Sequence, residues 1–152
     1  MDVINEFNQF IKQYKKLEFT QHIIQDLNIA EIHTIVVIGQ QSDININLLA
    51  KIRHISKSAA SQLISKLVSK QLVRKQRCND NKTLGLSLTN AGQVIFNIHD
   101  TQQKYIVEQL QAVFSGYSQR EITLIIGFMK DVEGVWENLP WLSKELDHDE
   151  TF

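Results

Sequence analysis

Cysteine and proline are almost absent from this sequence, and glycine is scarce. The chain has one Cys, one Pro and six Gly among its 152 residues. A single cysteine cannot form an internal disulfide, and it fits the reducing environment of a cytoplasm. So few Pro and Gly residues exclude flexible linkers, low-complexity segments and an all-β architecture rich in tight turns. We therefore expect one domain, residues 1–152, that is not all-β.

Long apolar runs are missing as well. None approaches the roughly 20 residues that are needed to span a bilayer. The first ten residues, MDVINEFNQF, are neither basic nor continuously apolar, so we expect no secretory signal there. Apolar residues nevertheless make up 43% of the chain, which is enough for a packed core. The expected localisation is cytoplasmic, without membrane contact.

Acidic residues are nearly absent from one segment, residues 51–82. This segment has nine basic side chains and one acidic side chain, whereas the other 120 residues have seven basic and sixteen acidic ones. The net charge of −1 therefore hides a strong asymmetry, which predicts a polyanionic partner. Nucleic acid is favoured over a membrane surface, because no basic amphipathic helix with bulky apolar anchors accompanies the segment.

Apolar periodicity and capping residues predict the order of elements along the chain. Asn28 and Glu31 are spaced as a capping box, Ser56 and Thr89 are further helix caps, and Pro140 should end or kink the last helix. The expected helices are 3–17, 29–39, 48–54, 56–71, 90–115 and 119–139, with a turn and short strand at 42–46 and a hairpin formed by 72–77 and 83–88. The stretch from Ile122 to Val132 is apolar almost all round, which is typical of a buried helix.

The polar surface of the expected helix 56–71 is slim and free of acid. A helix made only for solvent more often has Glu–Lys pairs, although a plain Ser-rich surface helix is the alternative. Ser and Gln side chains can read base edges in a major groove, and Lys can reach phosphates or guanine. The candidate recognition residues are Lys57, Ser58, Ser61, Gln62 and Lys66.

A basic hairpin follows this helix directly. Leu84, Leu86 and Leu88 alternate with small residues, so we expect this leucine face to pack on the helices and the basic tip to lie along a duplex. Helix, helix and hairpin in this order form a winged helix-turn-helix, so the predicted fold class is mainly α with a small β-hairpin wing (α+β). The candidate wing residues are Arg74, Lys75, Arg77, Asn79, Asp80 and Lys82.

The segments LNIAEIHTIVVIG, LLAKIRHISKSAASQLISKLVSKQLVRKQ and NDNKTLGLSLTNAG, in this order, resemble the MarR family of bacterial multiple-antibiotic-resistance repressors. The resemblance implies a homodimeric, sequence-specific DNA-binding regulator, with a winged helix-turn-helix at 28–89 and dimerisation helices at 1–25 and 90–148. It further implies a palindromic double-stranded operator and a repressor released by a small-molecule effector, whose binding site stays unknown. Two alternatives are a winged-helix protein-interaction adaptor and a redox-responsive regulator that acts through Cys78.

Four positions depart from the family pattern. Lys82 stands where the wing tip usually has Arg, which fits a narrow minor groove better. Gln62 replaces the usual Arg and moves the expected base preference from guanine toward adenine. Gln71 replaces the Gly that normally ends the recognition helix, so it must adopt a left-handed conformation. Arg53 stands at a usually apolar position of the short helix.

The sequence shows none of the common catalytic or metal-binding motifs. The sequence has no Gly-rich phosphate loop, nucleophile motif or paired metal motif, so we expect no enzyme, no cofactor and no metal site. Glu31, His33 and His99 are residue types found in zinc-responsive relatives, but no second histidine follows His99 within two turns. Cys78 has basic neighbours, yet an incidental exposed cysteine is favoured over a redox switch. The remaining histidines, His22, His54 and His148, are expected to be ordinary surface or half-buried residues.

Overall fold

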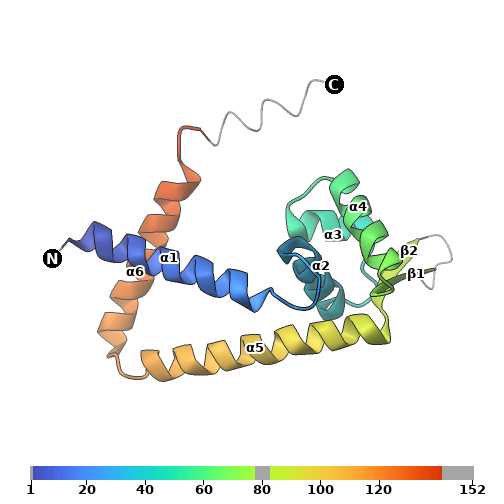
Figure 1. Ribbon diagram of the computed structural model, residues 1–152. Coiled ribbons are helices and arrows are strands. Elements are labelled where there is room, and N and C mark those ends of the chain that lie inside the picture. The colour runs from blue at the N-terminus through green and yellow to red at the C-terminus, as the bar shows by residue number, and fades with distance from the viewer. Residues whose placement is uncertain (1, 78–82, 142–152) are drawn as a thin grey trace. The chain divides into compact units, whose positions relative to one another are not determined.

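The computed structural model describes residues 2–77 and 83–141, and it is mainly helical with one small hairpin (Figure 1). The elements are α1 (Val3–Gln21), α2 (Ile29–Gln40), α3 (Ile46–Arg53), α4 (Lys57–Ser69), β1 (Val73–Arg77), β2 (Leu84–Leu88), α5 (Asn90–Phe114) and α6 (Gln119–Glu137). The chain divides into two compact units, residues 1–105 and residues 106–152. None of the described helices combines the length and the apolar character that a membrane crossing requires.

The first unit has a single apolar core, which α2, α3, α4 and the hairpin build beside the start of α5 (Figure 1). Its largest fully buried apolar side chains are Ile32, Ile35, Ile44, Leu49, Ile64, Leu67, Val73 and Ile95. These residues recur at three-to-four spacing on α2 and α4, so each helix turns one face inward and leaves the other free. The core therefore fixes which face of α4 is exposed.

Side-chain caps set where the helices of the core begin. The capping box of Asn28 and Glu31 is present, and Ser56 accepts a hydrogen bond from the Ala59 amide (3.1 Å), as predicted. The prediction for α3 was wrong by two residues, because the Asn45 side chain accepts from the Leu48 amide and starts the helix at Ile46. The expected strand at 42–46 is correspondingly reduced to a single bridge between Asn45 and Gly85.

The hairpin is antiparallel and pairs Val73 with Leu88 at its base and Arg77 with Leu84 at its outer end. Leu86 is buried and Leu88 half-buried, but Leu84 is 53% exposed. The expectation that all three leucines pack on the helices was therefore wrong for Leu84. It lies at the outer end of β2, beyond the contact with the core, where no helix covers it.

The end of α4, the base of the hairpin and the start of α5 meet at one tight junction. Gln71 has φ 58°, the predicted left-handed conformation. The Thr89 hydroxyl donates to the Gln71 carbonyl (2.6 Å) and accepts from the Gly92 amide (3.1 Å), so Thr89 caps α5 as predicted. Gly92 faces the backbone of Leu72 so closely that a Cβ there would lie 2.0 Å from the Leu72 carbonyl oxygen. The junction therefore ties the hairpin to two helices at once.

The second unit contains the end of α5 and α6, which begins with a capping box of Ser118 and Glu121. Helix α6 ends at Glu137, three residues before Pro140, which cannot continue a helix. No side chain of α6 is buried, and Leu124 and Phe128 are more than half exposed. The expectation of a buried helix is therefore not met by α6 among the described residues of the single chain.

Candidate nucleic-acid interface

The outward face of α4 presents the predicted recognition residues. Lys57, Ser58, Gln62 and Lys66 are exposed and Ser61 is half-buried. The opposite face, with Ala60, Ile64 and Leu67, is completely buried. Packing of one face therefore brings the candidates together on the other, where hydroxyl, amide and ammonium groups are free of acidic neighbours on the helix.

The turn between α3 and α4 fixes how α4 projects from the core. His54 closes α3 in a left-handed conformation (φ 50°), and its amide donates to the Lys51 carbonyl (3.2 Å). The next amide, of Ile55, donates to the Ala50 carbonyl (3.1 Å). This pair of bonds is the Schellman arrangement, which satisfies the last carbonyls of a helix. A helix-turn-helix thus precedes the hairpin in the structure.

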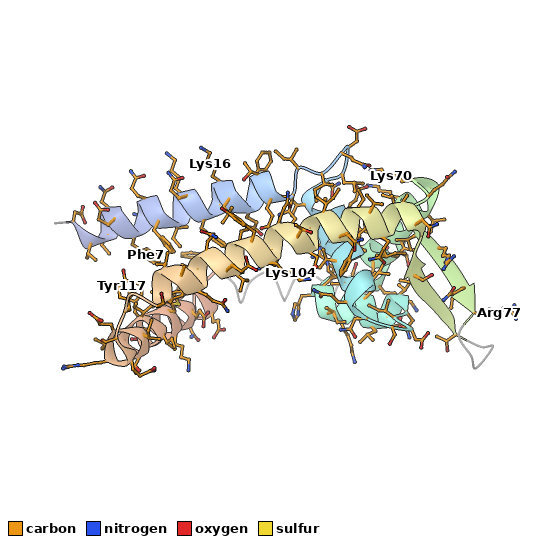
Figure 2. All side chains as sticks on the ribbon, turned by 90° about the horizontal axis from the view of Figure 1, so that it is seen from below. Phe7, Lys16, Lys70, Arg77, Lys104 and Tyr117 are labelled. Atoms are coloured by element: carbon orange, nitrogen blue, oxygen red, sulfur yellow. The ribbon has the colours of Figure 1, made fainter. Side chains whose placement is uncertain are left out.

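The described wing cations lie along β1. Arg74, Lys75 and Arg77 are exposed, and Arg77 lies at the outer end of the hairpin (Figure 2). The Arg74 Nε donates to the hydroxyl of Ser87 (2.9 Å), its partner across the strands, which orients the guanidinium. The predicted wing residues Asn79, Asp80 and Lys82 lie outside the described residues, as does Cys78.

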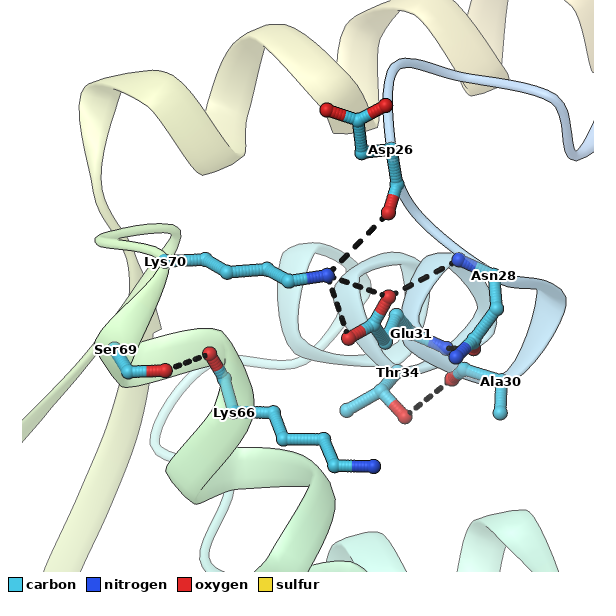
Figure 3. A network of polar contacts seen from close by, with 8 residues as sticks. All are labelled: Asp26, Asn28, Ala30, Glu31, Thr34, Lys66, Ser69 and Lys70. Atoms are coloured by element: carbon cyan, nitrogen blue, oxygen red, sulfur yellow. Dashed lines mark hydrogen bonds and ion pairs between the residues drawn. The ribbon is translucent and has the colours of Figure 1, made fainter.

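Lys70 departs from the other cations of the basic segment by pointing into the protein (Figure 3). Its Nζ lies 2.9 and 3.0 Å from the two carboxylate oxygens of Glu31, a residue only 2% exposed. It also donates to the Asp26 carbonyl at 3.4 Å. Sequence reasoning missed this pair, although Glu31 on an otherwise apolar helix needed a cationic partner if buried. The contact fastens the C-terminal end of α4 to the start of α2.

Glu31 is ionised in this setting. Burial raises the pKa of its carboxyl, but the Lys70 ammonium, the Asn28 amide and the charge of Lys66 outweigh burial and lower the pKa below its usual 4.5. Because the folded pKa is depressed, the pair stabilises the fold above about pH 4.5, and this contribution is lost as the pH falls through the folded value.

Arg53 is a second cation of the basic segment that does not simply face solvent. Its side chain is half-buried, its Nε is buried without a hydrogen-bond partner, and burial lowers the pKa of its guanidinium. The position is usually apolar in the resembling family, and the half-burial of Arg53 agrees with that pattern. Arg53 and Lys70 therefore contribute less to an outward cationic surface than the charge count of the segment suggested.

Three of the histidines lie together, away from α4. His22, at the C-terminal end of α1, is 5% exposed and contacts His33 of α2 and His99 of α5. The expectation that His22 is a surface or half-buried residue was therefore wrong, because α2 and α5 cover it. His54 is exposed, and His148 lies outside the described residues. Within the described ranges, no three His, Cys, Asp or Glu side chains are arranged to hold a metal ion.

Comparison with known proteins agrees with this geometry. Residues 27–83, which contain α2, α3, α4 and β1, match the model of the MarR family. This segment of the chain is therefore similar to the MarR family. The resemblance to this family, which the sequence analysis stated, is confirmed by this match. The mainly helical winged fold, also predicted from the sequence, is confirmed by the structure and by the solved structures described below.

Curated relatives of the chain are named as regulators of transcription. HTH-type transcriptional regulator PchR of Bacillus subtilis is 26% identical over 111 residues, which are 72% of this chain and 66% of the relative. The uncharacterized HTH-type transcriptional regulator YhjH of the same organism is 22% identical over 125 residues, 82% of this chain and 71% of the relative. These matches extend beyond the winged helix into the flanking helices.

Solved structures show the same fold. FabT of Streptococcus pneumoniae in complex with DNA superposes with a TM-score of 0.69 at 24% identity, covering 89% of this chain and 96% of FabT. ZitR of Lactococcus lactis in complex with DNA superposes with a TM-score of 0.72 at 19% identity, covering 90% of this chain and 99% of ZitR. The fold of this chain is thus shared by proteins that have been solved with DNA bound.

Proposed function

We propose that this chain is a cytoplasmic, homodimeric and sequence-specific MarR-family regulator of transcription, which represses by binding an operator and is released by an effector. One observation carries the proposal: the acid-free outer face of α4 adjoins the cationic strand β1. In a winged helix-turn-helix, the second helix enters the major groove and the wing follows the backbone. The relatives' names and the DNA-bound structures of FabT and ZitR support this assignment.

The two elements have complementary chemistry toward a duplex. The Gln62 amide can pair with adenine, and the small Ser58 and Ser61 side chains let the helix approach the base edges. Arg74, Lys75 and Arg77 meet phosphates, which supply affinity without reading sequence. We infer that α4 determines which site is bound and that the wing contributes mainly to how tightly any duplex is bound.

A second copy of the chain is the partner that best explains the apolar surface outside the winged helix. Monomeric proteins rarely expose large contiguous apolar patches, so helices with many exposed apolar side chains indicate a partner. Helix α1 has no buried side chain, and the second unit also exposes large apolar residues. The residues concerned are Val3, Ile4, Phe10, Tyr14 and Leu17 in α1, and Leu124, Ile126, Phe128, Met129 and Val135 in α6. Two-fold pairing through these helices would bury them in both copies.

The dimer predicts the form of the operator. Two recognition helices related by a two-fold axis reach successive major grooves when half-sites lie about one helical turn, ~34–36 Å, apart. Footprinting on the promoter of the protein's own gene should therefore protect an imperfect palindrome of roughly 16–20 base pairs. A protected site without two-fold symmetry would contradict the dimer, and the absence of any protected site would favour the adaptor alternative.

The first expected result separates the recognition helix from the wing. Gln62→Ala should reduce the preference for the operator over unrelated DNA by about 1–3 kcal/mol, because it removes a base contact. Arg77→Ala should weaken binding to both duplexes alike and reduce the salt slope by about one unit, because it removes a phosphate contact. Both effects are measured by fluorescence anisotropy over a salt series. Equal losses of specificity from the two variants would contradict this division.

The second expected result concerns the dimer. Leu124→Glu should shift the chain toward monomer in sedimentation velocity, because a charge would be buried at the proposed interface. The same charge one position earlier, in Thr123→Glu, replaces an exposed polar side chain and should disturb the dimer less. An unchanged dimer in Leu124→Glu would exclude this face of α6 from the interface.

A further inference from the structure

The three-histidine cluster, His22, His33 and His99, joins three helices with different tasks. The ring centroids of His22 and His33 lie 4.4 Å apart in an edge-on arrangement with an interplanar angle of 86°. The centroids of His22 and His99 lie 5.1 Å apart. Helices α1 and α5 belong to the proposed dimer scaffold, whereas α2 holds the end of the recognition helix through Glu31 and Lys70. The cluster therefore lies where the scaffold meets the DNA-binding part of the first unit.

Hydrogen bonding determines which nitrogen of each ring carries a proton. The Nδ1 of His22 contacts the backbone carbonyl of Glu18, which can only accept, so this nitrogen must be the donor. In the neutral ring the Nε2 of His22 is then an acceptor, and the Nε2 of His99, 3.3 Å away, must donate to it. The neutral His99 ring therefore holds its proton on Nε2 and joins α5 to the end of α1 through this bond.

The charged groups around the cluster oppose further protons. Arg53 from α3 brings a positive charge to His33. The carboxylate of Glu18 in α1 raises the pKa of His33, and that of Asp100 in α5 raises the pKa of His99. Both effects are smaller than the effects that lower these two pKa values. Burial lowers the pKa of His33, and the neighbouring histidines and Arg53 lower it further. Burial and the neighbouring His22 also lower the pKa of His99. At neutral pH these two rings are therefore uncharged and the packed arrangement is stable.

The direction of the pH effect follows from these shifts. A histidine whose folded pKa is below its ordinary 6.5 stabilises the packed state above about pH 6.5. This contribution is lost as the pH falls below that value toward the folded pKa, because the separated rings bind protons more tightly than the packed ones. Mild acidity thus favours separation of α1, α2 and α5 around the cluster.

We propose that the three-histidine cluster is a proton-binding site and that the proton is an effector that releases this regulator from its operator. The inference rests on the proposed function and names its regulation. Protonation of His33 and His99 places positive charges between α1, α2 and α5 and displaces α2 from the scaffold. Because α2 holds Lys70 through Glu31, this displacement moves α4 away from the position that fits both major grooves.

Operator binding by the full chain tests the proposal. Fluorescence anisotropy is measured from about pH 8 to about pH 5.5, which spans ordinary histidine titration, with EDTA in the buffer to keep metal ions off the imidazoles. We expect the operator Kd to rise on acidification by up to tenfold per pH unit for each proton taken up on release. Circular dichroism at each pH checks that the protein is folded.

Two variants test the cluster itself. His99→Gln keeps a donor for the Nε2 of His22 but cannot take up a proton, and His33→Gln removes the second titrating ring. Each variant should bind the operator at about pH 8 like the parent chain and lose about one proton from the slope of log Kd against pH. His54→Gln changes an exposed histidine outside the cluster and should retain the full slope. If His99→Gln does not fold, His33→Gln alone provides the comparison.

Failure of the switch and failure of the proposed function give different results. The switch is overturned if the operator Kd measured at about pH 8 stays constant or falls on acidification. It is also overturned if both cluster variants keep the parent chain's slope of log Kd against pH. No operator binding at any pH overturns the proposed function instead. A duplex of unrelated sequence serves as the reference, because a general effect of acid on contacts with the phosphate backbone changes the binding of both duplexes.

Discussion

Replacing Gly92 with alanine is expected to lower the free energy of unfolding by about 3 kcal/mol, the upper part of the range for overpacked sites. The new Cβ would lie 2.0 Å from the carbonyl oxygen of Leu72 and 3.4 Å from the Cβ of Leu88. The carbonyl is backbone and accepts a hydrogen bond from the Thr89 amide (3.1 Å), so it cannot turn away cheaply. The hairpin or the first turn of α5 must shift. Urea denaturation monitored by circular dichroism measures the loss.

Gly134 provides the matched control for this change. A Cβ at Gly134 meets no atom of the chain within 4 Å, and the residue lies inside α6. The same substitution should therefore leave stability unchanged or raise it by about 0.5–1 kcal/mol, because alanine favours the helix over glycine. A Gly92→Ala variant as stable as the parent chain would show that the junction is loosely packed.

Lys70→Met is expected to cost about 2–3 kcal/mol of unfolding free energy. The substitution keeps most of the apolar stem but leaves the nearly buried carboxylate of Glu31 without its cation. The figure is below that for a fully buried pair, because the Lys70 side chain is 38% exposed and water can partly replace it. Operator affinity should fall as well, since the end of α4 loses its attachment to α2. Thermal denaturation and anisotropy measure the two losses.

Two comparison variants show whether the charge of Glu31 causes the loss. Adding Glu31→Gln to Lys70→Met removes the unpaired charge and should recover about 1 kcal/mol. Lys104→Met removes the lysine of an exposed ion pair, Lys104 with Asp100 (2.7 Å), and should change stability very little. A double variant less stable than Lys70→Met alone would mean that the pair contributes packing and not charge compensation.

Local signals in the sequence predicted much of the fold. The capping box of Asn28 and Glu31, the caps Ser56 and Thr89, and the left-handed Gln71 depend on residues a few positions apart, so a short window contains the information. The outward placement of the described recognition residues followed from the three-to-four spacing of apolar residues on α4. The order of helix, helix and hairpin predicted the winged helix-turn-helix.

Apart from the start of α3, the errors come from contacts between residues that are distant in sequence. Glu31 and Lys70 are 39 residues apart and His22 and His99 are 77 apart, so no local pattern reveals that each pair meets. Alternation in β2 shows which leucines share a face, but it does not show that the core ends before Leu84. The exposure of the apolar residues of α6 also depends on long-range packing, because the apolar pattern of a helix does not show whether another part of the chain covers it.

The hairpin has one further consequence, for solubility. On one side β2 is bridged by Asn45, but among the described residues the outer edge of β1 pairs with no other strand. An open edge of this kind invites another strand to add to it, and natural proteins guard such edges with charge. Strand β1 has three exposed cations, Arg74, Lys75 and Arg77. When no DNA is bound, repulsion between these cations on two molecules opposes edge-to-edge pairing of their hairpins. Neutralising all three would therefore promote aggregation of the free protein, and loss of DNA binding in such a variant would have two causes.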